Sequence, residues 1–562
     1  MSLKLLLLAY GLMVQLPCPA QERTATKDDS RMVLNPAESQ YSISREMSGI
    51  VESAAEGNSD DQDADREIFD LIQMRQAAER GDAKAQYSLG VAYFKGKGVQ
   101  KDYTEAAKWS LKAAEQGNTK AQYNLGVACF HGDGVKKNYS EGVKWFRKAA
   151  GNNNVKAQYY LGIAYSHGAG VGKSKTEAAK WFQKAAEQGD AKAQYSLGVA
   201  YFKGKGVQKD YTEAAKWSLK AAEQGNTKAQ YNLGVACFHG DGVKKNYSEG
   251  VKWFRKAAGN NNVKAQYYLG IAYSHGAGVE KSETEAAKWF QKAAEQGNTK
   301  AQFKMGNAYC NGQGVEQNYT EAMQWYRRVA DRGDAMAQFN IGLAYMHGRG
   351  VEKSEMEAVK WFQKAAEQGH AKAQFEMGNA YCNGQGVERN YTEAMQWYRR
   401  VADRGDAMAQ FNIGLAYMHG RGVTKNEKEA AKWYRQAAEQ GDADAQSNLG
   451  NAYYTGRGVE QNYTEAVKWF KKAAEQGDAK AQYNLGIVYD TGHGVEQNST
   501  EAVKWYRRAA VQGVAEAQFN LGSCYINGEG VEKKEKEAAN WFRRAADQGH
   551  ENAIEALRKI QN

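Results

Sequence analysis

Histidines at one recurring position are the first residues that could bind a metal ion. Six of the nine histidines are separated by multiples of 36 residues, and each precedes a glycine. They are His131, His167, His239, His275, His347 and His419. If each ends a helix in a stack of helix pairs, neighbours lie on the order of 20 Å apart, because each helix layer is about 8–10 Å thick. One metal ion cannot reach two such side chains. We therefore expect capping of helix C-termini, with no metal and no other cofactor.

Cysteines could form disulfides or bind metal. Five of the six recur late in the predicted first helix of different repeats, and no two lie in adjacent repeats. They are Cys129, Cys237, Cys310, Cys382 and Cys524. No pair should come within disulfide reach, so these residues are predicted to be small buried apolar side chains. Free thiols are unusual in an exported protein, which counts against export.

One glycine-rich segment, 168–174, has the Gly-Lys-Ser ending of a phosphate-binding loop. That motif needs a glycine five residues before Gly172, where the chain has His167, and it needs a preceding strand. In the duplicated block Glu280 replaces Gly172, and glutamate would repel phosphate. The chain also contains no Ser-x-x-Lys, His-Glu-x-x-His or Cys-x-x-Cys. We therefore predict no catalytic site and no enzyme.

A 36-residue period organises most of the chain. The pair Ala-Gln recurs at this interval from Ala85 to Ala517, and all 13 tryptophans lie 24 residues after these alanines. The only three prolines precede residue 40, as continuous helical structure requires. A fixed period in this range is typical of a solenoid, in which each unit buries its apolar face against its neighbours. Near-identical blocks, such as 305–351 and 377–423, indicate internal duplication.

Each unit is predicted to contain two helices. In the first unit, apolar residues from Ala85 to Tyr93 recur at helical spacing, and Gly96 ends that helix. Thr104 is predicted to cap the second helix, which carries Trp109 and stops at Gly117. Two units replace this last glycine by Asn153 and Asn261, the residue type that best tolerates a left-handed backbone after glycine. Gly90, inside the first helix, indicates close approach of the second helix.

Charge and composition restrict the class of partner. The net charge of the 562 residues is +10, but residues 21–80 hold 7 basic residues against 14 acidic ones. In the rest of the chain lysine and arginine alternate with glutamate and form no basic run. A groove that follows a phosphate backbone is therefore not expected, and we predict no nucleic-acid partner.

The two ends differ from the repeats. Residues 1–20 combine Lys4, about a dozen apolar residues and a terminal Ala20, which predicts a signal peptide and no transmembrane segment in the mature chain. Residues 21–65 are predicted to be a disordered acidic leader. Residues 66–82 and 553–562 resemble a second and a first helix, respectively, and are predicted to be capping helices.

The repeat pattern, Ala-x-x-x-Leu-Gly-x-x-Tyr-x-x-Gly-x-Gly-Val followed by Glu-Ala-x-x-Trp-x-x-x-Ala-Ala-x-x-Gly, resembles the Sel1-like repeat, a relative of the tetratricopeptide repeat. The resemblance covers thirteen repeats over residues 83–552 and implies an all-α fold. That fold would be an α/α solenoid of 36-residue helix-turn-helix units wound as a right-handed superhelix. It also implies an adaptor in protein complexes, including exported bacterial proteins that engage envelope or host components. The chain lacks the disulfide that some members carry in each repeat.

One face of the first helices varies between units, and it is either the candidate face for a protein partner or a solvated face that varies without function. It lies opposite much of the core stripe and differs in residue type along the array, including Lys304 and Glu376. Its proposed members are Asn124, Tyr160, Asn232, Tyr268, Asn307, Asn340, Asn379 and Asn412. The tryptophans are instead predicted to be structural, including Trp109, Trp145, Trp181, Trp217, Trp253 and Trp289.

Three functions fit this sequence. The leading hypothesis is a non-enzymatic scaffold that binds proteins and is exported by a bacterium to the periplasm or the medium. A second is a β-lactam-binding or other enzyme-accessory protein, because some Sel1-like proteins are linked to β-lactams. A third is an intracellular structural adaptor in a signalling complex, which would follow if the N-terminus is not cleaved and the chain stays in the cytoplasm.

Overall fold

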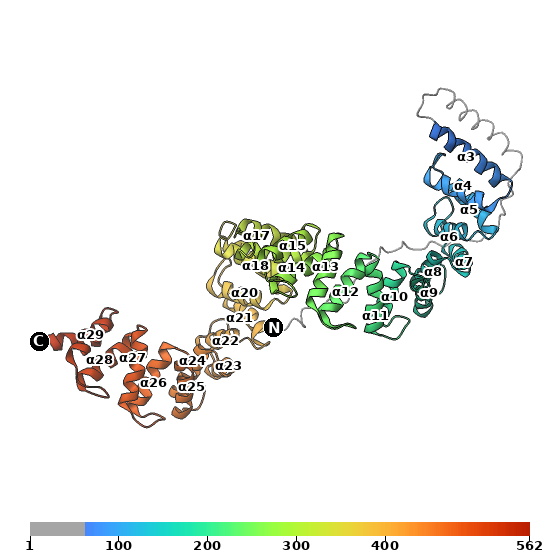
Figure 1. Ribbon diagram of the computed structural model, residues 1–562. Helices are drawn as coiled ribbons and strands as arrows, with labels where there is room; N and C mark the ends of the chain where they lie inside the picture. Colours follow the sequence, from blue (N-terminus) through green and yellow to red (C-terminus); the bar gives the residue numbers. More distant parts are fainter. Residues whose placement is uncertain (1–61, 562) are drawn as a thin grey trace. The chain divides into compact units, whose positions relative to one another are not determined.

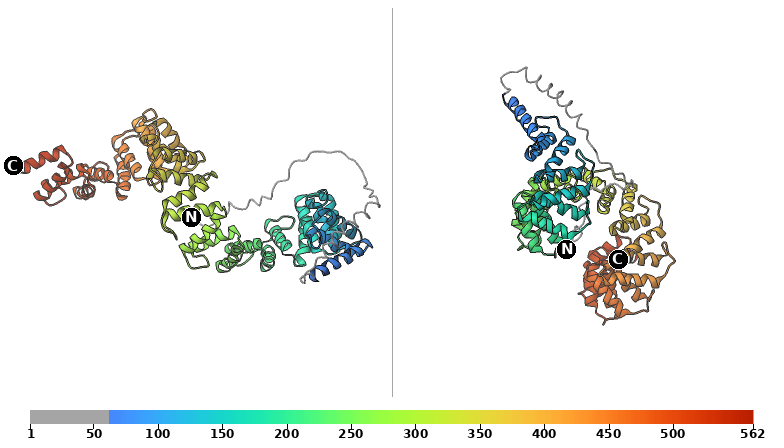
Figure 2. Two further views of the ribbon diagram at one scale, coloured as in Figure 1. Left: turned by 90° about the horizontal axis from the view of Figure 1, so that it is seen from above. Right: turned by 90° about the vertical axis from the view of Figure 1, so that its right-hand side faces the viewer.

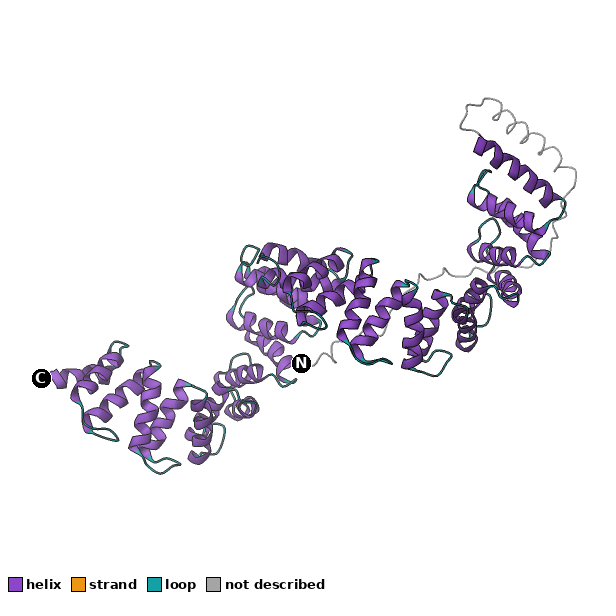
Figure 3. Ribbon diagram, in the orientation of Figure 1, coloured by secondary structure: helices purple, strands orange, loops and turns teal. Residues whose placement is uncertain are grey.

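The computed structural model describes residues 62–561, which form helices α3 to α30 and, within that range, no strand (Figure 3). The predicted signal peptide and the predicted leader up to residue 61 lie outside the described residues. The described chain divides into two compact units. One contains residues up to 157 together with 169–171, and the other contains 158–168 and 172 onward.

Thirteen helix pairs account for almost all of this structure. The first helices of the pairs are α4 (Ala83–Lys95), α6 (Thr119–His131), α8 (Val155–His167), α10 (Ala191–Lys203), α12 (Thr227–His239), α14 (Val263–His275), α16 (Thr299–Asn311), α18 (Ala335–His347), α20 (Ala371–Asn383), α22 (Ala407–His419), α24 (Ala443–Thr455), α26 (Ala479–Thr491) and α28 (Ala515–Asn527). The second helices are α5 (Tyr103–Glu115), α7 (Tyr139–Gly151), α9 (Lys175–Glu187), α11 (Tyr211–Glu223), α13 (Tyr247–Gly259), α15 (Glu283–Glu295), α17 (Tyr319–Ala330), α19 (Glu355–Glu367), α21 (Tyr391–Ala402), α23 (Glu427–Glu439), α25 (Tyr463–Glu475), α27 (Ser499–Val511) and α29 (Glu535–Ala546).

Among residues 62–561, one further helix precedes the pairs and one follows them. Helix α3 (Gln62–Glu79) begins four residues before the expected start at residue 66. Helix α30 (Glu551–Gln561) begins two residues before the expected start at residue 553. Within each unit, consecutive helices pack side by side in chain order (Figure 1, Figure 2).

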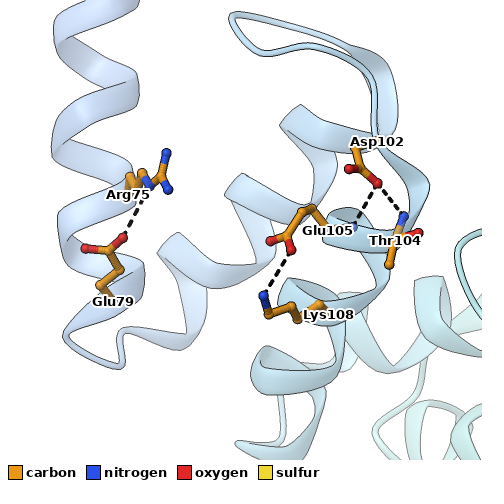
Figure 4. Close-up of polar contacts among 6 residues, drawn as sticks. All are labelled: Arg75, Glu79, Asp102, Thr104, Glu105 and Lys108. Carbon is orange, nitrogen blue, oxygen red and sulfur yellow. Dashed lines mark hydrogen bonds and ion pairs between the residues drawn. The ribbon is translucent and has the colours of Figure 1, made fainter. Parts of the chain in front are cut away.

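Helix ends follow the local sequence, with one correction. Residue Thr104 lies inside α5 and is not its N-cap, contrary to the prediction. The cap is Asp102, whose carboxylate accepts hydrogen bonds from the backbone N–H groups of Thr104 at 2.8 Å and Glu105 at 3.1 Å (Figure 4). Glu105 then pairs with Lys108 at 3.0 Å. A carboxylate in the first turn suits the positive end of the helix dipole. The same figure shows the Arg75–Glu79 pair in α3.

Residues with a left-handed backbone conformation follow helices α7 and α13, as predicted. Asn153 and Asn261 have φ of 61° and 57° and are the only non-glycine residues with positive φ among those described. The expectation for Gly90 is also confirmed, because a Cβ there would lie 3.1 Å from the Ala106 carbonyl oxygen and 3.0 Å from Ser110 Oγ of α5. The glycine therefore sets the distance between the two helices of the pair.

The core lies between neighbouring repeats as well as within each repeat. In one example, Phe290 of α15 packs with Met305 of α16 and with Trp325 of α17. Tyr326, also of α17, belongs to the next core cluster, so this second helix contributes to two consecutive clusters. Burial of the apolar residues of such a repeat therefore depends on its neighbour.

Candidate functional site

The eight residues of the candidate face are all half-buried on first helices, and none is fully exposed. Several of them contact the first helix of the preceding repeat. Burial raises the pKa of Tyr195, and Asn232, which lies near that tyrosine, acts less strongly to lower the pKa. The rings of Tyr231 and Tyr268 lie 5.8 Å apart. These members of the candidate face therefore connect neighbouring repeats, a role that the sequence analysis did not assign to them.

Other asparagines of the face contact the second helix of their own repeat. Asn307 Oδ1 accepts a hydrogen bond from the Tyr326 hydroxyl at 2.7 Å, and Asn379 Oδ1 accepts one from Tyr398 at 2.8 Å. Burial raises the pKa of both tyrosines, so each hydroxyl keeps its proton and remains a donor. The asparagine oxygens are thereby occupied, and their amide N–H groups face elsewhere.

A cavity of about 210 Å³ opens on this face, between α14, α15 and α16. Its walls include Ala286, Ala287 and Phe290 of α15. Its polar lining consists of Ser274, His275, Glu283, Lys304, Asn307 and Gln313. We call this cavity the Lys304 pocket. Asn307, a member of the predicted face, is therefore part of a concave polar site.

The turn after α16 positions one side of this pocket. A Cβ at Gly314 would lie 2.0 Å from the carbonyl oxygen of Glu283, so this turn packs directly on the start of α15. Gln313 precedes that glycine and lines the pocket. Glycine is needed here both for this close approach and for its φ of 73°.

The charges around the Lys304 pocket are not fully paired. Glu283 pairs with Lys281 at 3.5 Å and its side chain is 39% exposed, which places it at the rim. Within the described part of the chain, Lys304 is half-buried and has no ion-pair partner. A half-buried lysine without an ion-pair partner, on a concave surface, favours an anionic ligand group.

The recurring histidines lie at the surface and form no metal-binding cluster among the described residues. The six recurring histidines are exposed at the ends of first helices. His167 and His275 hydrogen-bond the carbonyl oxygens of Ile163 at 3.0 Å and Ile271 at 2.9 Å. Residues 62–561 contain no group of three His, Cys, Asp or Glu side chains that could hold a metal ion.

The glycine-rich segment 168–174 packs closely against another part of the chain. A Cβ on Gly170 would lie 2.3 Å from the backbone of Tyr139, so close packing accounts for the glycine at this position.

The five recurring cysteines are free thiols. Cys129, Cys237 and Cys524 are buried, as predicted, whereas Cys310 and Cys382 are only half-buried. Burial raises the pKa of Cys524 to about 12, which keeps this thiol protonated and unreactive at neutral pH.

The tryptophans form the outer edge of the core. Trp109, Trp145, Trp217 and Trp253 are buried, whereas Trp181 and Trp289 are half-buried. In twelve of the thirteen repeats a lysine or arginine three residues later lies over the ring, 4.0–4.6 Å from its centroid. The exception is Trp433, which Gln436 follows at that spacing. This cation–π pair was not predicted from the sequence, although its spacing of three residues is visible there.

The chain is similar to proteins built from a known repeat. A family model described as the Sel1 repeat matches thirteen consecutive segments, from 83–118 to 515–550. A crystal structure of a protective antigen of uropathogenic Escherichia coli, with the same repeat fold, is 36% identical, covers 87% of this chain and 97% of its own, and has a TM-score of 0.67.

A Sel1 repeat protein from Oxalobacter formigenes is 31% identical, covers 55% of this chain and 90% of its own, and has a TM-score of 0.47. Among curated proteins no match was found. No helix in the described range combines the length and apolar character needed to cross a membrane.

Proposed function

Because the chain belongs to the Sel1 repeat family over residues 83–550, we propose that it is a non-enzymatic scaffold that binds proteins through its first helices. One observation carries the proposal. The Lys304 pocket opens on the candidate face, and Lys304 has no ionic partner among the described residues. The solenoid core does not require a charged residue at that position, since other repeats hold serine, asparagine or tyrosine there.

The site agrees better with recognition than with catalysis. The lining of the Lys304 pocket offers amide, hydroxyl and ammonium groups that can hold a partner side chain. Repetition of this face along the array would allow several weak contacts to act together on one partner. A protein segment is therefore the ligand class that suits this surface best.

The scaffold proposal is tested by capture of partners on two sets of variants of the full chain. Lys304→Ser with Asn412→Ser alters the candidate face at half-buried positions. Lys144→Ser with Lys252→Ser is the matched control, because these lysines are exposed on second helices. A partner that is lost from the first variant and retained by the control supports binding by the first helices. Equal capture by both variants contradicts it.

We further propose that a bacterium exports the chain to the periplasm or the medium, where envelope or host proteins are its partners. The apolar segment before Ala20 supports this proposal. Export also agrees with the description of the 36% identical structure as a protective antigen. N-terminal sequencing of the protein from bacterial fractions tests export. Gln21 as the first residue of an extracytoplasmic chain supports it, and an uncleaved chain in the cytoplasm supports the intracellular adaptor instead.

A further inference from the structure

Two stretches of the array form a natural matched pair. We call residues 263–334 the first copy and residues 335–406 the second copy. Their last repeats, 299–334 and 371–406, differ at only three positions. These are Thr299 and Ala371, Lys304 and Glu376, and Gln317 and Arg389. The exchange of Lys304 for Glu376 therefore reverses the charge at one point of the candidate face while the surrounding repeat is almost unchanged.

In the second copy a carboxylate already occupies this position. Asn379 Nδ2 donates a hydrogen bond to Glu376 Oε2 at 3.2 Å, while Asn379 Oδ1 accepts from Tyr398. The buried tyrosine hydroxyl holds the amide in this orientation, with its N–H groups toward the carboxylate. Both the oxygen and the nitrogen of Asn379 thus have partners within the chain.

In the first copy the same amide lacks a carboxylate. Asn307 Oδ1 accepts from Tyr326 as in the second copy, but among the described residues Nδ2 has no acceptor. Lys304, at the position of Glu376, contributes a second donor without an ionic partner. Lys304 and Asn307 thus line one pocket with two donors that have no acceptor among the described residues, and a negatively charged acceptor would complement both.

The first copy also has room for that group. Ser274 and Ala287 line the Lys304 pocket, whereas the second copy has Met346 and Val359 at these positions. Both larger side chains pack in the core around Phe362. The smaller residues leave the cavity of about 210 Å³.

We propose that the Lys304 pocket binds a carboxylate from an acidic side chain of a partner protein, which accepts hydrogen bonds from Asn307 Nδ2 and Lys304 Nζ. This inference rests on the proposed scaffold function. A free acid would form too few contacts to offset its lost freedom of motion, whereas a carboxylate on a longer segment gains contacts along the face. Glu283 at the rim repels a second negative charge, so a single acidic residue is favoured over an acidic run.

The test uses the full chain and a biotinylated peptide with an amidated C-terminus, in which one glutamate among glycine and serine residues is the only carboxylate. A carbodiimide couples the peptide carboxylate to any lysine that holds it, and mass spectrometry reads the extent of coupling at each lysine. The reference is Lys428, which is exposed on α23. We expect coupling at Lys304 about tenfold above that at Lys428, because charge-assisted hydrogen bonds retain the carboxylate.

Two variants make the test specific. Ser274→Met with Ala287→Val fills the pocket with the side chains of the second copy and leaves the Lys304 amine in place. It should reduce coupling at Lys304 to the level of Lys428. Glu376→Lys with Met346→Ser and Val359→Ala should create a second strongly coupled site at position 376, a gain that misfolding cannot imitate.

Equal coupling at Lys304 and Lys428, or coupling at Lys304 that the filling variant leaves unchanged, would overturn the proposal. The outcome is distinguishable from failure of the scaffold proposal. The coupling experiment measures binding of a carboxylate in the pocket itself, whereas the capture experiment measures binding of a partner protein. Strong coupling without any captured partner would support a carboxylate site and count against the scaffold.

Discussion

The first and second copies build the same helices from nearly the same residues, yet they present different chemistry on the candidate face. In the second copy Met346 and Val359 fill the space beside Phe362, and the Glu376 carboxylate accepts a hydrogen bond from the amide nitrogen of Asn379. In the first copy the space is open and the corresponding donors are unpaired. The difference shows that a repeat can change its surface function without changing its core, because few side chains control both the cavity and its charge.

The largest expected effect is the loss of stability when the buried phenylalanine of each copy is truncated. Phe290→Ala and Phe362→Ala should each cost about 3–5 kcal/mol, because both rings are buried against a helix glycine. The loss of stability should be greater for Phe362→Ala than for Phe290→Ala. Phe362 packs with Met346 and Val359, whereas Phe290 lies beside the cavity. Native-state hydrogen exchange of α15 and α19 measures each loss locally, as a repeat array requires. A greater loss at Phe290 would show that the Lys304 pocket is not open.

A second comparison concerns the glycines that bring the paired helices together. An added Cβ would lie 2.6 Å from the Tyr326 ring in Gly306→Ala and 2.5 Å from the Tyr398 ring in Gly378→Ala. Displacement of either ring should lower the free energy of unfolding by about 1–3 kcal/mol. The higher helix propensity of alanine offsets part of this loss. Hydrogen exchange in α16 and α20 should show equal losses. Unequal losses would mean that the cores of the copies differ as much as their surfaces.

The copies should also respond differently to pH. The N-cap of α16 is Asn298, whereas the N-cap of α20 is His370, whose Nδ1 accepts from the Ala373 N–H at 3.2 Å. Burial, with Lys372 nearby, lowers the pKa of His370, although Asp334 acts in the opposite direction. The unfolded chain therefore binds the proton more readily, and the stability of α20 should fall as pH drops below the ordinary histidine pKa of about 6.5.

The size of this pH effect should approach the roughly 1 kcal/mol of a lost N-cap, because a protonated imidazole cannot accept the hydrogen bond. Hydrogen exchange of α20 measured from pH 8 to pH 5 should show the loss, whereas α16 should not. His370→Asn should remove the dependence. Identical pH profiles for His370→Asn and the native chain would contradict this assignment.

The smallest expected effect is a gain in stability in the first copy. Gln302 Oε1 is buried without a partner, and Arg332 donates to the Thr299 hydroxyl in addition to the Gly297 carbonyl oxygen. In the second copy, which has Ala371 in place of Thr299, Arg404 donates to Gln374 Oε1 at 2.6 Å. Thr299→Ala should redirect Arg332 to Gln302 and stabilise α16 by less than about 1 kcal/mol.

Hydrogen exchange of α16 measures this gain, and Ala371→Thr is the reciprocal control that should weaken α20. Loss of stability in Thr299→Ala would show that Arg332 does not move.

Local sequence determined the helix pairs and most of their ends. The 36-residue period, the left-handed Asn153 and Asn261, and the close approach at Gly90 were all predictable, because caps and helical spacing act within a few residues. Even the error at Thr104 had a local signal. Asp102 precedes Glu105 by three residues, the spacing of an N-cap and its first-turn glutamate.

The candidate site was predictable only in part. The variable positions on the first helices, including Asn307, were identified from the sequence, and so was the exchange of Lys304 for Glu376. Which of these side chains are available to a partner was not. Tyr195 meets Asn232 from 37 residues away, and the cavity depends on Ser274, 30 residues before Lys304.

The physical reason lies in the range of the interactions. A helix, its caps and its apolar stripe are set by contacts within four residues, so their pattern is written along the chain. A pocket is the space that three packed helices leave between side chains of different volume, and a free donor is one that no distant neighbour satisfies. Only the tertiary structure, by placing Ser274, Ala287 and Asn307 around Lys304, decided where this protein has an open polar site.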